Sequence, residues 1–253
     1  MEKKTILIAG YGNIGKYLYK ELGKLNPVIY DKYIPEYSET INARYHAAFV
    51  CVPTEMLPDG SADISIVEEV VSQVSADVIC IKSAVPVGTT DMLAEKYGKY
   101  IVISPEYYGT TQHSPDSPDF LVLGGDVKHT REIAQLYYKV KRASFRVRFT
   151  DAKTAELAKY MENCFLALKV TFCSEFKQIG DKFGVPYEDL REIFIMDERM
   201  GESHTFVYED TPFYDSYCLN KDVSALISFA RDVPLIKAMH EINMKKKTER
   251  PNK

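Results

Sequence analysis

A short glycine-rich segment near the amino terminus constrains the fold more than any other part of the sequence. Residues 10–15 read Gly-Tyr-Gly-Asn-Ile-Gly, directly after the apolar run at 5–9 and directly before a stretch with helical periodicity. In a strand–turn–helix unit the first glycine permits a tight turn, the second lets the backbone approach a pyrophosphate, and the third lets helix and strand pack closely. Free N–H groups at the start of the helix then face the anion. The segment therefore predicts a dinucleotide-binding unit.

A second apolar run, residues 28–31, ends in Asp31. A carboxylate at this position accepts hydrogen bonds from both ribose hydroxyls of the adenosine and repels the 2′-phosphate of NADP. Asp31 therefore predicts NAD as the cofactor, with Gly10, Gly12 and Gly15 at its pyrophosphate. A glycine-rich turn followed by a capping aspartate is the plainer alternative, and the agreement of strand, spacing and acidic residue favours the cofactor.

The other residues expected to bind NAD lie in the same turn or just after predicted strands. The full predicted set is Gly10, Gly12, Asn13, Ile14, Gly15, Asp31, Lys32, Val52, Pro53, Thr54 and Ser83.

From residue 5 to about residue 149, short β-branched runs alternate with stretches of helical periodicity. The predicted strands are residues 5–9, 28–31, 48–52, 77–82, 100–104, 120–123 and 145–149. Helical stretches are predicted between several of them, at residues 14–25, 64–74 and 130–140. Near-continuous apolar strands that alternate with helices indicate an α/β fold, a Rossmann-like doubly wound parallel sheet covered on both faces.

The pattern changes near Asp151. Residues 152–183 read as one long helix without proline, and the sequence after it is mostly helical with one irregular loop at roughly residues 201–219. We therefore predict two domains, a Rossmann domain over residues 1–150 and a mostly α-helical domain over residues 151–253.

The composition is that of an ordinary globular protein, with 253 residues, 45% of them hydrophobic, 27% charged and a formal net charge of −4. This charge gives no general attraction to nucleic acid, and no apolar run reaches the roughly eighteen residues that span a bilayer. Because no signal-peptide pattern is present, we expect a cytoplasmic protein. The basic residues from Lys245 onward read as a frayed, solvated terminus. The spacing of the cysteines and histidines predicts reduced thiols and no metal site.

Several further segments together resemble one known family. They read Phe-Val-Cys-Val-Pro-Thr at residues 49–54, Ile-Lys-Ser-Ala-Val-Pro-Val-Gly-Thr-Thr at 81–90, Ser-Pro-Glu-Tyr at 104–107, Ala-Glu-Leu-Ala-Lys-Tyr-Met-Glu-Asn-Cys-Phe at 155–165 and Cys-Leu-Asn-Lys-Asp at 218–222. In order and spacing they are similar to the UDP-glucose/GDP-mannose dehydrogenase family, over about residues 4–245. The resemblance implies an NAD-dependent oxidoreductase that oxidises a CH–OH group of a nucleotide sugar, such as UDP-glucose, to the uronate.

The resemblance also assigns the chemistry to particular side chains. Family members convert a primary alcohol to a carboxylate in two hydride transfers, through a covalent adduct on cysteine. The matching residues imply Cys218 as the nucleophile and Glu106 as a general acid or base that acts through water. Lys159 and Asn163 direct an ammonium and an amide at one substrate oxygen, because residues four apart share a helix face. Asp222 orients water or a neighbouring group.

Three departures from the family keep other functions open. Family enzymes usually continue into a second Rossmann-like domain that binds the nucleotide of the sugar, so we expect a truncated form without it or a partner that supplies it. The loop at residues 212–217 lacks the usual glycines, and Ala84 stands where the family usually has threonine. The alternatives are a two-electron dehydrogenase of a smaller substrate and an NAD-binding or scaffolding protein without turnover.

The helical region also predicts self-association. The long helix at residues 152–183 and the helix after Lys221 would leave apolar faces exposed in a monomer, and such faces mark interfaces. We therefore expect a homodimer. Arg199 resembles a family arginine that reaches the substrate in a neighbouring subunit's site, although a surface salt bridge explains it equally well.

Overall fold

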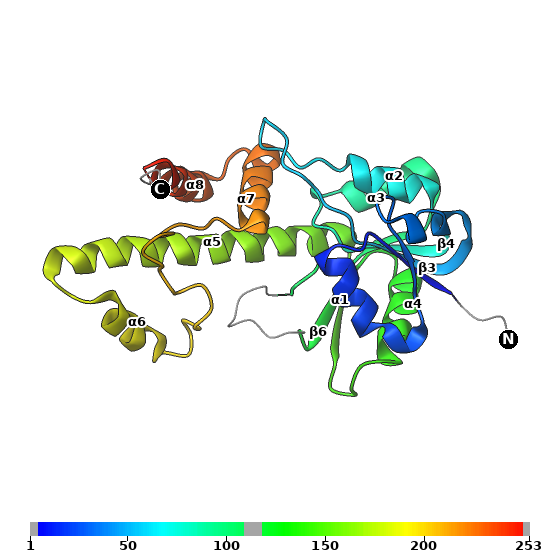
Figure 1. Cartoon of the computed structure of the whole chain (residues 1–253), viewed down its shortest axis with the longest axis horizontal. Helices are drawn as coiled ribbons and strands as arrows, with labels where there is room; N and C mark the ends of the chain where they lie inside the picture. Colours follow the sequence, from blue (N-terminus) through cyan, green and yellow to red (C-terminus); the bar gives the residue numbers. More distant parts are fainter. Residues whose placement is uncertain (1–4, 109–117, 250–253) are drawn as a thin grey trace. The chain divides into compact units, whose positions relative to one another are not determined.

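The computed structural model describes residues 5–108 and 118–249, which form two compact units (Figure 1). The described residues of unit 1 are 5–55, 62–108 and 118–159, and those of unit 2 are 56–61 and 160–249. The boundary predicted at residues 150–151 coincides with the start of helix α5 (Ala152–Phe183). The two units divide within this helix, after Lys159.

Within its described residues, unit 1 contains a seven-stranded sheet with helices on both faces. The strands are β1 (Ile6–Ala9), β2 (Val28–Tyr30), β3 (Arg44–Val50), β4 (Ser75–Ile81), β5 (Ile101–Ile103), β6 (Phe120–Gly124) and β7 (Arg146–Thr150). The helices are α1 (Asn13–Glu21), α2 (Ser65–Gln73), α3 (Thr89–Tyr97) and α4 (Val127–Tyr138). The strand order is β2-β1-β3-β4-β5-β6-β7, and every neighbouring pair is parallel except β5 and β6. The predicted α/β fold with a mostly parallel sheet is confirmed.

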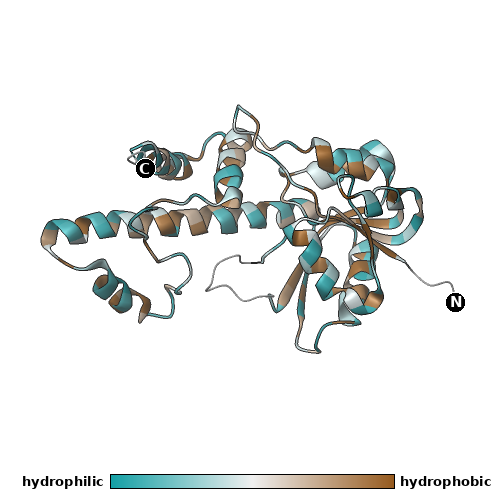
Figure 2. Cartoon of the chain, viewed as in Figure 1, coloured by the Kyte–Doolittle hydropathy of each residue, from teal (hydrophilic) through white to brown (hydrophobic). Residues whose placement is uncertain are grey.

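The sheet has this architecture because its central strands are apolar on both sides. Successive side chains of a strand point to opposite faces, so Leu7 and Ala9 join an apolar cluster that includes side chains of α2 and α3. Ile6 and Ile8 join the second cluster, on the opposite face, with side chains of α1 and α4. Figure 2 shows the hydrophobic character of the strands. Burial of both faces is what continuous apolar strands require.

Two local differences from the prediction have simple physical reasons. Helix α3 was not among the predicted helical stretches, because its apolar side chains are few; glycines with positive φ, Gly88 and Gly98, bound it. Helix α1 ends at Glu21, and a separate 3-10 turn over Gly23–Leu25 occupies the end of the predicted helical stretch.

Unit 2 contains the rest of α5 together with α6 (Tyr187–Ile195), α7 (Tyr217–Ala230) and α8 (Pro234–Thr248). The loop between α6 and α7 is held by cations of the helices. The ammonium of Lys169 donates to the carbonyls of Met200 and Gly201, and the buried guanidinium of Arg191 donates to the hydroxyl of Thr205 at 2.9 Å.

The end of the chain differs from the prediction. Lys245, Lys246 and Lys247 lie inside helix α8, so the prediction of a frayed terminus is wrong for them. The remaining basic residues of this segment, from residue 250 on, lie outside the described residues. No helix in the described ranges has the length and apolar character that a membrane crossing requires.

Candidate functional site

The glycine-rich turn has the geometry that its sequence predicts. Gly10 has φ +96°, and a Cβ there would lie 2.6 Å from the carbonyl oxygen of Cys51. A Cβ at Gly15 would lie 1.9 Å from the carbonyl oxygen of Gly10. Around Gly12, by contrast, nothing lies within 4 Å of the position that a Cβ would take. Two glycines are therefore required by packing, and the third leaves the backbone open to a ligand.

Helix α1 begins without a side-chain cap. Its N-cap is Gly12, which has no side chain to accept a hydrogen bond from the first N–H groups, and its first turn contains no acidic residue. Asn13 and Ile14 are its first two residues, with Asn13 exposed and Ile14 packed against the apolar cluster of this face. A helix start with uncapped N–H groups and a partial positive charge fits a pyrophosphate.

Asp31 lies directly after β2 and faces this turn. The backbone N–H of Tyr11 donates to its Oδ2 at 2.9 Å, and the backbone N–H of Tyr33 donates to its Oδ1 at 3.0 Å. An ionised carboxylate has about four acceptor positions, so each oxygen retains capacity for a ribose hydroxyl. Lys32, next in the chain, forms an exposed ion pair with Glu69.

The remaining predicted cofactor residues follow β3 and β4 and are tied to one another. The hydroxyl of Ser83 donates to the carbonyl of Val52 at 2.6 Å, and the buried hydroxyl of Thr54 donates to the carbonyl of Ala84 at 3.0 Å. Pro53 is exposed between them. These segments lie at the carboxyl ends of parallel strands, the edge at which open α/β sheets bind ligands.

Glu106 lies beyond the carboxyl end of β5 and is paired with a buried lysine. The ammonium of Lys82 is 3.2 Å from Oε2 of Glu106 and donates to the hydroxyl of Ser104 at 3.0 Å. Burial raises the pKa of Glu106, and the charge of Lys82 opposes this without cancelling it. For Lys82, burial favours the neutral form, yet the Glu106 carboxylate leaves its pKa above the usual value. A carboxyl group with a raised pKa suits proton transfer near neutral pH.

Lys159 lies close to the same segment. Its ammonium is 4.7 Å from the centre of the Tyr107 ring, in a cation–π arrangement. The Tyr107 ring in turn packs against Phe120, with 5.0 Å between ring centres. Glu106 and Lys159 therefore belong to one local arrangement within unit 1, joined through Tyr107.

The motif that contains Lys159 also contains a carboxylate with a structural task. Glu156 is 1% exposed and accepts hydrogen bonds from the backbone N–H groups of Gly88 and Thr90, and from the Thr90 hydroxyl, at 2.5–2.8 Å. Its carboxyl group caps the start of helix α3. Glu156 therefore fixes the first turns of α5 against the segment that follows β4.

In unit 2, Cys218 lies in the first turn of α7 and is exposed. Ser216 caps this helix, because its hydroxyl accepts from the N–H of Leu219 at 3.2 Å. A helix start favours negative charge on a side chain in its first turn, which suits a thiolate nucleophile. The position therefore combines access with electrostatic support.

The other four cysteines are different. Cys51, Cys80, Cys164 and Cys173 are all buried. Burial raises the pKa of Cys80 to about 12 and that of Cys164 to about 12. Buried thiols of this kind pack as small apolar side chains, so Cys218 is the exposed thiol of the five.

Asn163 and Asp222 belong to one buried cluster in unit 2. The amide of Asn163 donates to Oδ2 of Asp222 at 2.5 Å, and the ammonium of Lys221 lies 2.5 Å from Oδ1 of the same carboxylate. All three side chains are buried. Asp222 therefore orients Asn163 and is itself neutralised by Lys221. In the chain, Lys221 follows the exposed Cys218 by three positions and Asp222 follows it by four.

The glycine-free loop before Cys218 turns two of its three aromatic side chains inward. Phe213 and Tyr214 are buried within unit 2, whereas Asp215, Ser216 and Tyr217 are exposed. Two of the bulky side chains in this loop are thus packed into the protein. Arg199, predicted to reach a substrate, is 83% exposed and forms an ion pair with Asp197.

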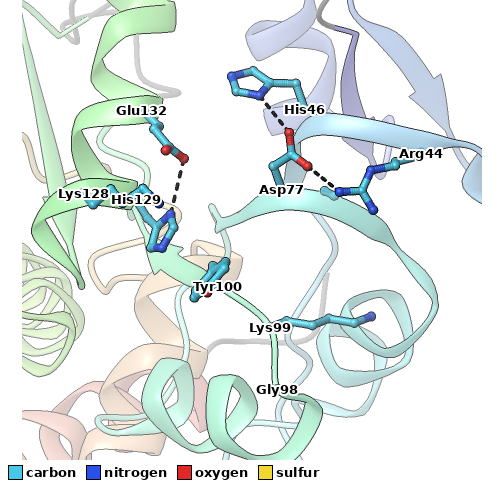
Figure 3. A pocket seen from close by; sticks show the side chains of 10 residues that line it. Arg44, His46, Asp77, Gly98, Lys99, Tyr100, Lys128, His129 and Glu132 are labelled. Carbon is cyan, nitrogen blue, oxygen red and sulfur yellow. Dashed lines mark hydrogen bonds and ion pairs between the residues drawn. The ribbon is translucent and has the colours of Figure 1, made fainter.

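A separate cavity of about 490 Å³ opens at the opposite edge of the unit 1 sheet (Figure 3). His46 and Arg44 both pair with Asp77 on one side, and His129 pairs with Glu132 on the other. These residues lie at or near the amino ends of the strands, away from the glycine-rich turn. Among the described residues, no cluster of three or more histidine, cysteine or acidic side chains could hold a metal ion.

Sequence reasoning missed Lys82, Ser104 and Tyr107 as partners of Glu106 and Lys159. A signal for Lys82 existed. A lysine directly after the apolar run at residues 78–81 is expected to be buried and therefore paired with a carboxylate. The Tyr107 contact had no comparable signal, because it depends on where α5 lies against the segment.

Comparison with known families identifies the family to which the chain belongs. The NAD binding domain of the UDP-glucose/GDP-mannose dehydrogenase family matches residues 35–141, and the central domain of the same family matches residues 153–245. The chain belongs to this family. The resemblance found in the sequence is confirmed.

Two curated relatives are UDP-glucose 6-dehydrogenases. The enzyme of Pseudomonas aeruginosa is 32% identical over 222 residues, which make up 79% of this chain and 48% of that enzyme. The enzyme of Rickettsia bellii is 29% identical over 234 residues, 87% of this chain and 53% of that enzyme. The chain thus spans about half the length of these relatives.

Solved structures show the same fold. A UDP-glucose dehydrogenase of Pyrobaculum islandicum superposes with a TM-score of 0.77 at 24% identity, covering 96% of this chain and 67% of that one. A 3-hydroxyisobutyrate dehydrogenase of Mycobacterium tuberculosis superposes with a TM-score of 0.70 at 16% identity, covering 98% of this chain and 94% of that one.

Proposed function

We propose that the protein is an NAD-dependent dehydrogenase that oxidises a primary alcohol of a nucleotide sugar, such as UDP-glucose, to the uronate through an adduct on Cys218. Family membership supplies the class of reaction. The observation that supports the adduct is the contrast among the thiols, because Cys218 alone of the five cysteines is exposed, and it occupies the start of a helix.

The proposed cofactor site is the carboxyl edge of the unit 1 sheet, within the proposed NAD domain of residues 1–150. The N–H groups at the start of α1 receive the pyrophosphate beside Gly12, and Asp31 receives the adenosine ribose. Val52, Thr54 and Ser83 complete the wall at the ends of β3 and β4. When bound, NAD supplies the hydride acceptor for both oxidations.

In the first oxidation, the alcohol must lose a proton as well as a hydride. Glu106 takes this proton through water, and its raised pKa makes the carboxylate a stronger base for this step. The ammonium of Lys159 stabilises the negative charge that develops on the substrate oxygen. The product of this step is an aldehyde.

In the second oxidation, the Cys218 thiolate adds to the aldehyde carbon, and the aldehyde oxygen is stabilised as it gains charge. Loss of a hydride from this adduct leaves a thioester on Cys218. Water then breaks the carbon–sulfur bond, which releases the acid and regenerates the thiol. We assign Asp222 and Asn163 to orienting this water and the substrate oxygen. The net change is alcohol plus water to acid, with two hydrides and two protons removed.

We further propose that the protein acts as a homodimer built on α5 and α7, in the helical domain of residues 151–253. Large apolar side chains recur along the exposed face of α5 in unit 2 at Met161, Phe165, Phe172, Phe176, Ile179 and Phe183. A continuous exposed apolar face of this kind is typical of an interface. Arg199 is exposed and available to such a partner.

A second candidate is a two-electron dehydrogenase of a smaller substrate. The observation that favours it is the likeness in fold to the M. tuberculosis enzyme, which extends over 94% of that enzyme's length. The retained Cys218 favours the four-electron route.

Replacement of Cys218 tests the proposal. Across a panel of nucleotide sugars and simple sugars, we expect wild type to form two NADH per acid. We expect Cys218→Ser to lower acid formation by at least about 100-fold, because a serine hydroxyl is a far weaker nucleophile, with NADH binding unchanged. Cys173→Ala, at a buried thiol, is the control and should retain activity.

Each other outcome selects a different function. Acid formed equally fast by Cys218→Ser contradicts the adduct. One NADH per substrate, with little effect of the substitution, identifies the two-electron dehydrogenase. NAD binding without turnover on the whole panel identifies a binding protein.

A further inference from the structure

The loop that leads into Cys218 is held by the last helix of the chain. Asn243 of α8 accepts from the backbone N–H of Tyr214 at 2.8 Å and donates to the carbonyl of the same residue at 3.0 Å. Asn243 is 1% exposed. One side chain therefore satisfies both backbone groups of a loop residue, as a neighbouring β-strand would.

Two further contacts come from the same face of α8. The Tyr214 hydroxyl lies 2.9 Å from Nδ1 of His240, and the ammonium of Lys247 pairs with the Asp215 carboxylate. His240, Asn243 and Lys247 are three and four residues apart, so they lie on one side of the helix. This side of α8 is directed at the loop.

The start of the loop is fixed by a relay. The hydroxyl of Ser174, a buried residue of α5, donates to the carbonyl of Pro212 at 2.5 Å. The ammonium of Lys246 on α8 donates to that hydroxyl at 2.7 Å. The loop is thus attached at Pro212, Tyr214 and Asp215, the last of which precedes the N-cap Ser216 by one residue.

These restraints matter because the loop runs directly into the helix that carries the thiol. Ser216 and the first N–H groups of α7 create the electrostatic environment of Cys218. The charged side chains of the loop and the first two turns of α7 are Asp215, Lys221 and Asp222, and those of α8 that contact the loop or its anchor are Lys246 and Lys247. A loop free to move would let the first turn of α7 fray and would displace the thiol.

We propose that Asn243, assisted by Lys247, is a positioning residue for Cys218: it holds residues 212–216 so that the thiol keeps its place in the first turn of α7. The inference rests on the proposed role of Cys218 as the nucleophile. It assigns to α8 a part in the reactivity of a residue on another helix.

The reactivity of the thiol can be measured without substrate or cofactor. Intact protein is alkylated with iodoacetamide between pH 6 and pH 10, and modification of Cys218 is followed by mass spectrometry, with thermal unfolding recorded for each variant. The four buried thiols do not compete in the folded protein. Because no turnover is needed, this result is independent of whether the proposed dehydrogenase activity is found.

Asn243→Ala should lower the alkylation rate at pH 7 by roughly threefold, since the thiolate loses its support from the helix start. At pH 10, where the thiol is ionised in both proteins, the rates should be equal. Lys247→Ala should shift the profile in the same direction by less. Lys245→Ala, at a lysine of α8 that pairs with Glu249, should leave the profile unchanged.

Coincident pH profiles of folded Asn243→Ala and wild type overturn the proposal. An equal change in rate at every pH also overturns it, because altered exposure alone would then explain the effect. If Asn243→Ala does not fold, Lys247→Ala decides the question: a slower rate at pH 7 with an equal rate at pH 10 supports the proposal, and an unchanged profile overturns it.

Discussion

Two turns in this protein perform the same task by different physical means. Residues 10–15 lead from β1 into α1, and residues 212–217 lead into α7. Each leads into a helix whose first turn carries a proposed functional group, the N–H groups of α1 or the thiol of Cys218. The first turn is shaped by the absence of side chains at Gly10 and Gly15, whereas the second is shaped by side chains that reach it from other helices.

The difference lies in where the restraints come from. At the first turn, the Gly15 backbone packs directly on the carbonyl of Gly10, five residues away. At the second, Tyr214 is held by Asn243, twenty-nine residues further along the chain. A locally shaped turn can be recognised from a short motif. A turn that is held by distant residues cannot be recognised from a short motif. Its own residues can change as long as the distant residues that contact it change with them.

Gly15→Ala should give the largest effect, because its Cβ would lie 1.9 Å from a backbone oxygen that cannot move freely. We expect it to destabilise unit 1 by at least about 3 kcal/mol, measured by urea unfolding. Gly12→Ala is the matched control, since nothing lies within 4 Å of its Cβ; it should fold normally and lose affinity for NADH in a fluorescence titration. Equal stability of the two variants would remove the distinction between local and remote restraint.

Glu156→Gln tests a turn that combines both means, because Gly88 at the start of α3 is held from α5. An amide nitrogen in place of one carboxyl oxygen faces an N–H donor, which we expect to cost about 1–3 kcal/mol at pH 5. Burial raises the pKa of Glu156, so the wild-type group stabilises the fold most below the ordinary glutamate pKa and less as the pH rises through its folded value. Urea unfolding should therefore show the largest difference in free energy of unfolding between the two proteins near about pH 4, and a smaller difference at higher pH. A gap that widens with pH would contradict this assignment.

Asp31→Asn should have the smallest effect. It retains the shape of the side chain and removes the charge that would face the 2′-phosphate of NADP. We expect the preference for NADH over NADPH to fall roughly tenfold, equivalent to about 1.4 kcal/mol, with stability almost unchanged. Lys24→Ala, at an exposed lysine outside the predicted cofactor set, should leave the preference as it is. An unchanged preference in Asp31→Asn would place the ribose elsewhere.

The sheet could be predicted from the sequence, because most of its seven strands are apolar runs long enough to be recognised. The glycine-rich turn could also be predicted, because its shape depends on a few glycines that lie close together in the sequence. The candidate site was predicted as individual residues through the family resemblance. Their partners were not predicted, since the pairing of Glu106 with Lys82 and of Asn163 with Asp222 depends on how distant segments pack.

The glycine-free loop at residues 212–217 shows most clearly what cannot be predicted from the sequence. In the sequence, the absence of the family's usual glycines from this loop kept functions other than nucleotide-sugar oxidation open. In the structure, Phe213 and Tyr214 point into unit 2, because Asn243 pairs with the backbone of Tyr214 and holds it in that orientation. An inward or outward direction of a loop side chain is decided by its tertiary partner, and the sequence of the loop alone does not contain that information.

The reversal of direction between β5 and β6 has a consequence for the position of a charge. In a strictly parallel sheet, the chain that leaves one strand must travel to the far edge before it can begin the next. Here β6 runs against β5, so the chain returns at the edge from which it departed. Phe120, the first residue of β6, thereby meets Tyr107, which follows β5 by four residues. The Tyr107 ring, packed against Phe120, lies under the ammonium of Lys159, so the reversal that begins at β6 and continues in β7 places a cation near the edge of the sheet where β5 ends.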